Sequence, residues 1–123
     1  MNRIVAIAAA GLMLASAPAW SVEPGKSAPA REQAGKVVFD QWCSACHGPN
    51  PRLAGTLALQ TKYEGQIPAA LEERTDLTPD IVASFVRGGV AWMAPFRKTE
   101  ISDAELADLG AYLSKTPAQR RRK

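Results

Sequence analysis

The sequence predicts a small all-α domain of three or four helices. The chain has 123 residues, which is enough for one small domain and no more. Apolar residues recur at helical spacing in several segments, and these segments begin and end with residues that favour helix caps. No run alternates apolar and polar residues as a half-buried strand would. We place the domain at residues 33–116.

The first nineteen residues have the pattern of a signal peptide. Arg3 precedes an apolar run over residues 4–15, and Ala17-Pro18-Ala19 matches a signal peptidase site. A retained membrane anchor is the alternative, but the run is shorter than the roughly 20 residues that span a bilayer as a helix. We therefore expect cleavage before Trp20, export to the periplasm and no membrane anchor in the mature chain.

The first helix is expected to follow a flexible leader. Residues 20–32 are rich in Ser, Pro, Gly, Ala and Lys, as linkers are. From Gln33 one helical face carries apolar residues as far as Cys43, namely Ala34, Val37, Val38 and Trp42. Gly48-Pro49-Asn50-Pro51 then forces a loop. Residues 53–75 allow one or two further short helices.

A later helix has a clear start signal. Thr78-Pro79-Asp80 combines a hydroxyl N-cap, a proline in the first turn and an acid near the helix N-terminus. Gly88-Gly89 would end this helix, and residues 90–100 are expected to be irregular. The predicted buried stripe consists of Ile81, Val82, Phe85 and Val86.

The last helix is the best specified. Ser102 and Glu105 have the spacing of a capping box, and Ile101 can pack onto Leu106 across the helix start. We expect Pro117 to end this helix. A basic tail then covers residues 117–123.

The charge is divided between a mildly acidic body and the basic tail. Of the fifteen Lys and Arg residues, one is Arg3 and four end the chain, so residues 20–119 carry ten basic against twelve acidic residues, a net charge of −2. We interpret the tail as a solvated end. An exported protein whose body has no basic face is not expected to bind nucleic acid.

The segment Cys43-Ser44-Ala45-Cys46-His47 is typical of covalent haem attachment. Residues three apart lie on the same face of a helical turn, so both thiols can reach the two vinyl groups of one porphyrin. The histidine that follows then falls under the iron, and the chain has no other histidine. We expect one haem c attached through Cys43 and Cys46, with His47 as the proximal ligand.

Three other interpretations of the two cysteines are weaker. A disulfide at this spacing would not need a histidine at the next position, and a structural zinc site would need four ligands. A thioredoxin-like redox pair belongs to a βαβ context that the helical pattern lacks. A helical domain this small also needs an internal staple, which a covalent haem would supply.

Met93 is the expected sixth ligand of the iron. Apart from Met1 and Met13 it is the only methionine, and it lies in the irregular loop before the last helix. Methionine among aromatic residues also serves as core filler, but Pro95 would stiffen the backbone just after Met93. A His and Met pair raises the reduction potential and leaves no open iron position for oxygen or peroxide. A backbone carbonyl in residues 49–54 is expected to hold the other ring nitrogen of the proximal histidine.

From about residue 33 to residue 115 the chain resembles class I cytochromes c. Gly35 and Phe39 in the first helix, with Tyr112 in the last, resemble the helix crossing of that family, where a glycine permits close approach. The resemblance implies the class I fold, packed around one covalent haem. It assigns the haem roles of the family to Cys43, Cys46, His47 and Met93.

A narrower resemblance lies in LEERTDLTP at residues 71–79, FVRGGV at residues 85–90 and PFRKTEISDAEL at residues 95–106. These segments resemble the small cytochrome subunit of 4-cresol dehydrogenase (p-cresol methylhydroxylase) and the related eugenol hydroxylase cytochromes. In those enzymes an FAD subunit oxidises a 4-alkylphenol. The cytochrome, which is no enzyme by itself, accepts the electrons singly and passes them to a periplasmic acceptor such as a cupredoxin or another cytochrome c. The resemblance thus implies an FAD-containing flavoprotein partner, and it offers no counterpart for the tail at residues 120–123.

Two alternatives to a flavocytochrome subunit stay open: a free-standing soluble carrier, and an enzyme or sensor that binds a small ligand at an open haem. For a flavocytochrome subunit, the apolar neighbours of Met93 would form a dry contact patch, consisting of Ala91, Trp92, Ala94 and Phe96. The acidic body would favour a basic partner surface, and salt would then slow association.

Overall fold

The structure, a computed structural model, describes residues 25–122, so the predicted signal peptide lies outside the described residues. The elements in chain order are α1 (Ala28–Trp42), α2 (Ser44–His47), α3 (Ala54–Tyr63), the 3₁₀ turn η1 (Leu71–Glu73), α4 (Pro79–Gly88), α5 (Asp103–Leu113) and α6 (Pro117–Arg120). Within this range no strand forms, apart from one isolated bridge between Val90 and Met93. The all-α prediction is confirmed. None of the helices described here is long and apolar enough to cross a membrane.

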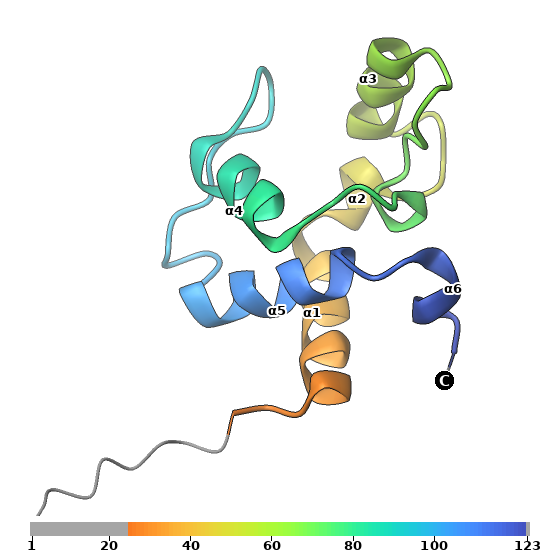
Figure 1. The fold of residues 1–123 in the computed structure, drawn as a ribbon. Helices are drawn as coiled ribbons and strands as arrows, with labels where there is room; N and C mark the ends of the chain where they lie inside the picture. The colour runs from red at the N-terminus through yellow and green to blue at the C-terminus, as the bar shows by residue number, and fades with distance from the viewer. Residues whose placement is uncertain (1–24, 123) are drawn as a thin grey trace, which may run out of the picture.

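The fold is organised by the crossing of α1 and α5 (Figure 1). A Cβ on Gly35 would lie 2.2 Å from the carbonyl oxygen of Asp108 and 2.6 Å from the Cβ of Tyr112, so only glycine allows this approach. Phe39 and Tyr112 pack beside it in a tilted arrangement, with ring centroids 6.0 Å apart. The crossing that the resemblance to class I cytochromes c implies for these three residues is therefore confirmed.

Helix α4 packs on α5, and both helices begin as predicted. The Thr78 hydroxyl accepts a backbone N–H of the first turn of α4 at 3.2 Å. Ser102 and Glu105 form a reciprocal capping box at the start of α5, and the predicted contact pair Ile101 and Leu106 is buried in the core. The most deeply buried side chains of the core are Phe39, Ile101 and Leu109.

Helix α1 begins at Ala28, five residues before the predicted start at Gln33. Ser27 is its N-cap and Pro29 lies in its first turn, where a missing N–H costs nothing because that group would have no helical partner. Residues 28–32, which were expected to belong to a flexible leader, are thus helical.

The predicted buried stripe of α4 is only half buried. Val82 and Val86 belong to the core, but Ile81 is 39% and Phe85 is 44% exposed. The stripe of residues 81 and 85 is offset by one residue, or about 100° around the helix, from that of residues 82 and 86. Helix α5 therefore covers the second pair and leaves the first pair partly open.

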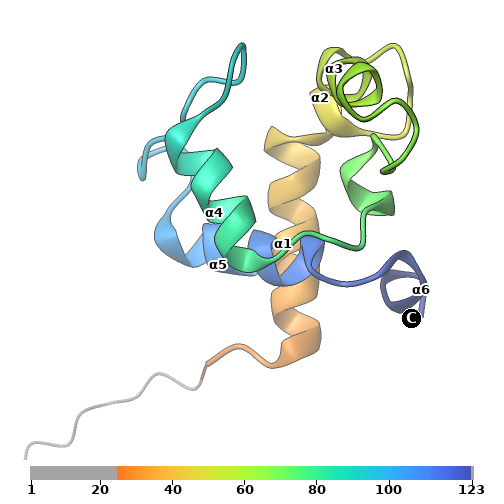
Figure 2. The ribbon, with the colours of Figure 1, turned by 45° about the horizontal axis from the view of Figure 1, so that its top comes forward.

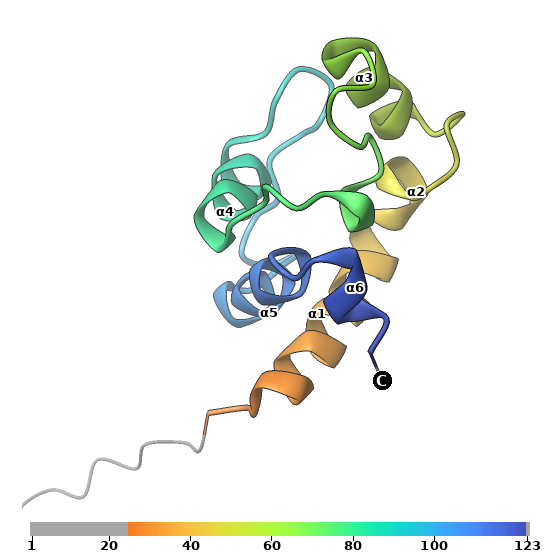
Figure 3. The same ribbon diagram turned by 45° about the vertical axis from the view of Figure 1, so that its right-hand side comes forward.

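The loop between α4 and α5 lies at the same end of the molecule as α2 and α3. Figures 2 and 3 show all three far from the start of α1, which points away at the opposite end. The last turn of α1 leads directly into α2 at this end. Of the predicted haem-binding residues, Cys43 lies at the junction of α1 and α2, Cys46 and His47 lie in α2, and Met93 lies in the loop.

Replacing Gly35 by Ala should lower the free energy of unfolding by about 3 kcal/mol, because the new methyl group meets a backbone oxygen that cannot move aside. Chemical denaturation of the holoprotein measures this change. Gly88→Ala is the matched control: nothing lies within 4 Å of its Cβ, and it should leave stability unchanged or raise it by up to about 1 kcal/mol. Equal effects of the two substitutions would contradict the close crossing.

Candidate functional site

The cysteines and the histidine of the predicted motif share a single helical turn. Cys43 is both the C-cap of α1 and the N-cap of α2. Its carbonyl oxygen accepts the N–H of Cys46 at 3.0 Å and the N–H of His47 at 2.8 Å. The side chain of Cys43 is buried in the core, whereas Cys46 is exposed. The first cysteine of the motif is therefore fixed in the core, whereas the second cysteine is accessible to solvent.

The two thiols are free, and the Cys43 thiol differs from the reactive thiol of a redox-active pair. Burial, together with the neighbouring Cys46, raises the pKa of the Cys43 thiol to about 11. A thioredoxin-like cysteine pair depends instead on a lowered pKa. Within residues 25–122 no three side chains of His, Cys, Asp or Glu gather as a metal site. The turn is thus not arranged as a disulfide oxidoreductase site.

The imidazole of His47 packs on the first turn of α3. A Cβ on Gly55 would lie 2.5 Å from Cε1 and 2.7 Å from Nδ1 of the ring, so the glycine lets the backbone of α3 touch the ring edge. Burial lowers the pKa of His47, which favours the neutral form that a metal ligand needs. Nδ1 is buried and has no hydrogen-bond partner among the described residues. The expected hydrogen bond from this nitrogen to a carbonyl of residues 49–54 is therefore not formed, because the backbone at Gly55 occupies that side of the ring.

Met93 is held by a tight hairpin turn. Val90 and Met93 exchange two backbone hydrogen bonds, both 2.9 Å long. Ala91 lies between them with a φ of 49°, a left-handed conformation that costs free energy in a residue other than glycine and that recurs at functional sites. The methionine itself is partly buried against the core.

The loop around Met93 is fixed at both ends. Gly89 has a φ of 66°, and a Cβ there would lie 2.6 Å from the Met93 carbonyl oxygen. The Phe96 N–H donates to the carbonyl of Val86 at 2.8 Å, and the Arg87 guanidinium donates to the carbonyl of Phe96 at 3.1 Å. The Phe96 ring meets the Trp42 ring edge-on, with centroids 5.8 Å apart. This last contact joins the methionine loop to the residue that precedes the first cysteine.

Helices α3 and α4 and the methionine loop expose large apolar side chains. Leu57 in α3 is 52% exposed and Val90 in the methionine loop is 49% exposed, in addition to the two open residues of α4. Exposed apolar side chains of this size often mark a binding surface, and a flat macrocycle is a ligand that they suit. Two free thiols on one turn and a buried, unpartnered imidazole nitrogen complete the donor set. These residues fit a covalently attached haem.

Arg120 belongs to the folded body, which corrects the prediction that it is part of a solvated tail. Its guanidinium donates to the carbonyl oxygens of Tyr112 and Leu113, both at 3.1 Å, and to those of Lys115 and Glu72. It thereby satisfies carbonyls that the end of α5 leaves without helical partners. The sequence signal for this ordered end was Thr116-Pro117-Ala118-Gln119, which forms the capping box of α6. Pro117 therefore starts α6, and α5 already ends at Leu113.

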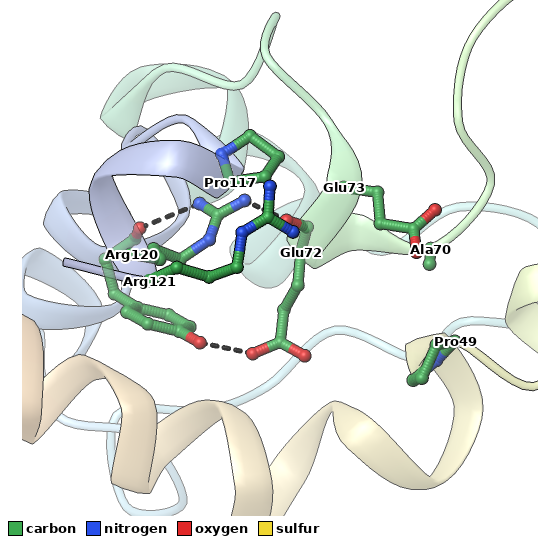
Figure 4. Close-up of a pocket in the computed structure, with 8 residues that line it drawn as sticks. Pro49, Ala70, Glu72, Glu73, Pro117, Arg120 and Arg121 are labelled. Carbon is green, nitrogen blue, oxygen red and sulfur yellow. Dashed lines mark hydrogen bonds between the residues drawn. The ribbon is translucent and has the colours of Figure 1, made fainter.

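Arg120, Glu72 and Tyr112 form a cluster that lies beside the loop following the C-x-x-C-H turn. The Tyr112 hydroxyl donates to the carboxylate of Glu72. Figure 4 shows Glu72, Arg120 and Pro49 around one pocket, which Tyr112 also lines. Burial and the neighbouring carboxylate raise the pKa of Tyr112. The C-terminal turn thus braces η1 and α5 near the loop that follows His47.

Two residues of α3, Gly55 and Thr56, also contact the C-x-x-C-H turn. They are not among the predicted site residues, because no sequence pattern distinguishes them from other residues of a short helix.

A helix crossing at glycine, a C-x-x-C-H turn and a methionine loop at one end of the molecule define a c-type cytochrome. The family model described as cytochrome c oxidase, cbb3-type, subunit III matches residues 30–113, and the chain belongs to this family. No curated protein and no solved structure matches the chain. The family confirms a class I-like cytochrome c that carries covalently bound haem and transfers electrons. The narrower resemblance to the 4-cresol dehydrogenase cytochrome stays a prediction.

Proposed function

We propose that this cytochrome is the electron-transfer subunit of a flavocytochrome. It accepts electrons singly from an FAD subunit that oxidises a 4-alkylphenol of the p-cresol or eugenol type, and it passes them to a periplasmic cupredoxin or another cytochrome c. The observation that carries the proposal is the fully exposed Trp92 beside Met93. The three sequence segments that resemble the 4-cresol dehydrogenase cytochrome support the identity of the partner.

Four residues would hold one haem in this chain. Cys43 and Cys46 would bind it covalently, with His47 as the proximal and Met93 as the distal ligand. The bound haem supplies a one-electron couple, whose potential a methionine ligand raises. The backbone at Gly55 keeps the imidazole in place, and the pinned hairpin keeps the methionine in place. Apolar side chains packed against the bound haem would limit the access of water, which affects the reduction potential.

Trp92 has the properties of a partner contact. Truncation of tryptophan at an interface is often costly, because the side chain buries a large apolar area. The charged side chains that follow in the loop are paired within the chain, Arg97 with Glu100 at 3.0 Å and Lys98 with Asp103 at 2.6 Å. This pairing supports a complex held at the loop by apolar contact, while the net charge of the body steers the approach.

A second candidate is supported by the family itself. The family is named for subunit III of cbb3-type cytochrome c oxidase, so delivery of electrons to an oxidase would use the same loop surface. A free-standing carrier would use this surface transiently with several partners. A ligand-binding enzyme or sensor would require that Met93 leave the iron open.

Replacing Met93 by Ala should lower the reduction potential by on the order of 0.1 V, since loss of a thioether ligand removes its preference for ferrous iron. The variant should also lose the weak far-red band of the ferric protein, which redox titration and absorption spectroscopy detect. Trp92→Ala is the control, because this neighbouring side chain points to solvent and should change neither property. Rapid carbon monoxide binding by the unmutated ferrous protein would argue for an open iron position instead.

Trp92→Ala should slow reduction by the substrate-reduced flavoprotein about tenfold, because loss of a tryptophan contact costs about 1.4 kcal/mol or more. Stopped-flow absorbance of the haem measures the rate. Val37→Ala, which removes an exposed apolar side chain from α1, should leave the rate unchanged. If the unmutated protein is reduced no faster than an unrelated cytochrome c and forms no complex on gel filtration, the flavocytochrome proposal is wrong and a free carrier is left.

A further inference from the structure

We propose that Gly55 and Thr56 are positioning residues that fix the orientation of His47 toward the haem iron. Both lie in the first turn of α3, and neither belongs to the attachment motif. The inference rests on the assignment of His47 as the proximal ligand. It does not depend on which protein donates electrons.

Thr56 ties together the backbone on the two sides of His47. It is a polar residue with only 3% of its surface exposed. Its hydroxyl donates to the carbonyl oxygen of Gly48 at 2.7 Å and lies 3.3 Å from the carbonyl oxygen of Cys46. A hydroxyl carries a single proton, so the Gly48 carbonyl is the main acceptor. One side chain from α3 thus holds the residues immediately before and after the histidine.

This hydrogen bond also closes an otherwise incomplete helix end. Helix α2 is a single turn, and Gly48 is its C-cap with an extended ψ of −179°. The last carbonyls of a helix accept no hydrogen bond within it and need a donor from elsewhere. Because Thr56 is buried, no water replaces its hydroxyl without rearrangement. The turn that carries His47 is therefore held by α3 rather than by its own length.

Gly55 limits the rotation of the imidazole. A Cβ at this position would lie 2.5 Å from Cε1, 2.7 Å from Nδ1 and 2.8 Å from the Cys46 carbonyl oxygen. The backbone of α3 is therefore in contact with the Nδ1 edge of the ring, and the ring cannot swing toward α3. Nδ1 is buried against this wall, which leaves Nε2 as the nitrogen for the iron. The anchored backbone around His47 and the restricted imidazole ring together fix a single orientation of this side chain.

Thr61 shows that the Thr56 contact is not a general property of the helix. Thr61 lies in the same helix, five residues later, and its exposed hydroxyl donates to the Leu57 carbonyl within α3 at 3.1 Å. Bonds of this kind are local and common in helices. Only the Thr56 hydroxyl reaches from α3 to the attachment turn. Groups around a metal ligand that fix its ring orientation commonly affect the metal as well as the fold.

The test compares three variants of the holoprotein. Thr56→Val keeps the shape but removes the hydroxyl, Thr56→Ser retains the hydroxyl, and Thr61→Val removes a hydroxyl elsewhere on the helix. The measurements are the hyperfine-shifted NMR resonances of the His47 ring in the ferric protein and the reduction potential. We expect Thr56→Val to shift both, Thr56→Ser to restore values near those of the unmutated protein, and Thr61→Val to change neither.

A purely structural role for Thr56 would give a different result. Thermal unfolding is followed for the same variants, and a lowered Tm for Thr56→Val with unshifted His47 resonances would overturn the proposal. If Thr56→Val does not accumulate as holoprotein, the unmutated ferrous protein supplies the test, because the buried Thr56 hydroxyl proton should exchange slowly with solvent. Rapid exchange would contradict the contact. Absence of hyperfine shifts at His47 in the unmutated protein would instead refute the ligand assignment itself.

Discussion

The close contact of α1 and α5 at Gly35 is the constraint on which the site depends. Helix α1 ends at the first cysteine, and α5 packs on α4, which leads into the methionine loop. The two halves of the predicted haem site are therefore attached to helices that meet at one glycine. The ring contact between Trp42 and Phe96 joins the halves a second time, near the site itself. A change in the crossing would be transmitted to the spacing of both ligands.

The polypeptide alone leaves surfaces at this end of the molecule that a folded protein usually covers. Large apolar side chains are open on α3, α4 and the methionine loop, and a buried imidazole nitrogen has no partner within residues 25–122. A domain of this size buries only a modest apolar core, so it gains much from a covalent staple. A haem held at the ligand positions would cover part of this apolar surface and leave Trp92 open to a partner. The exposed apolar side chains and the unpartnered imidazole nitrogen are thus the features that indicate a bound haem.

Local signals in the sequence predict much of this molecule. The C-x-x-C-H turn, the N-cap at Thr78 and the capping box at Ser102 each depend on residues within a few positions of one another. The crossing at Gly35 was accessible only through the family resemblance, because nothing local marks a glycine that meets a distant helix. Ligation of the iron by Met93 stays a prediction.

Long-range contacts explain what the sequence could not predict. Arg120 looks like one cation of a basic run, but it binds carbonyls of α5 and of η1, which is 48 residues distant in sequence. Ile81 and Phe85 have the spacing of a buried stripe, yet α5 covers only the neighbouring pair. Thr56 has no distinguishing neighbours in the sequence, and its role follows from two carbonyls on either side of His47. Each of these depends on how elements pack, which periodicity does not encode.

The central claim is that Cys43 and Cys46 bind one haem covalently. Intact-mass spectrometry of the protein purified from the periplasm tests it most directly. The mass should equal that of residues 20–123 plus one haem, with both cysteines unavailable to thiol reagents. A polypeptide mass lower by two hydrogens, without haem, would show a disulfide between the cysteines and would contradict the cytochrome assignment.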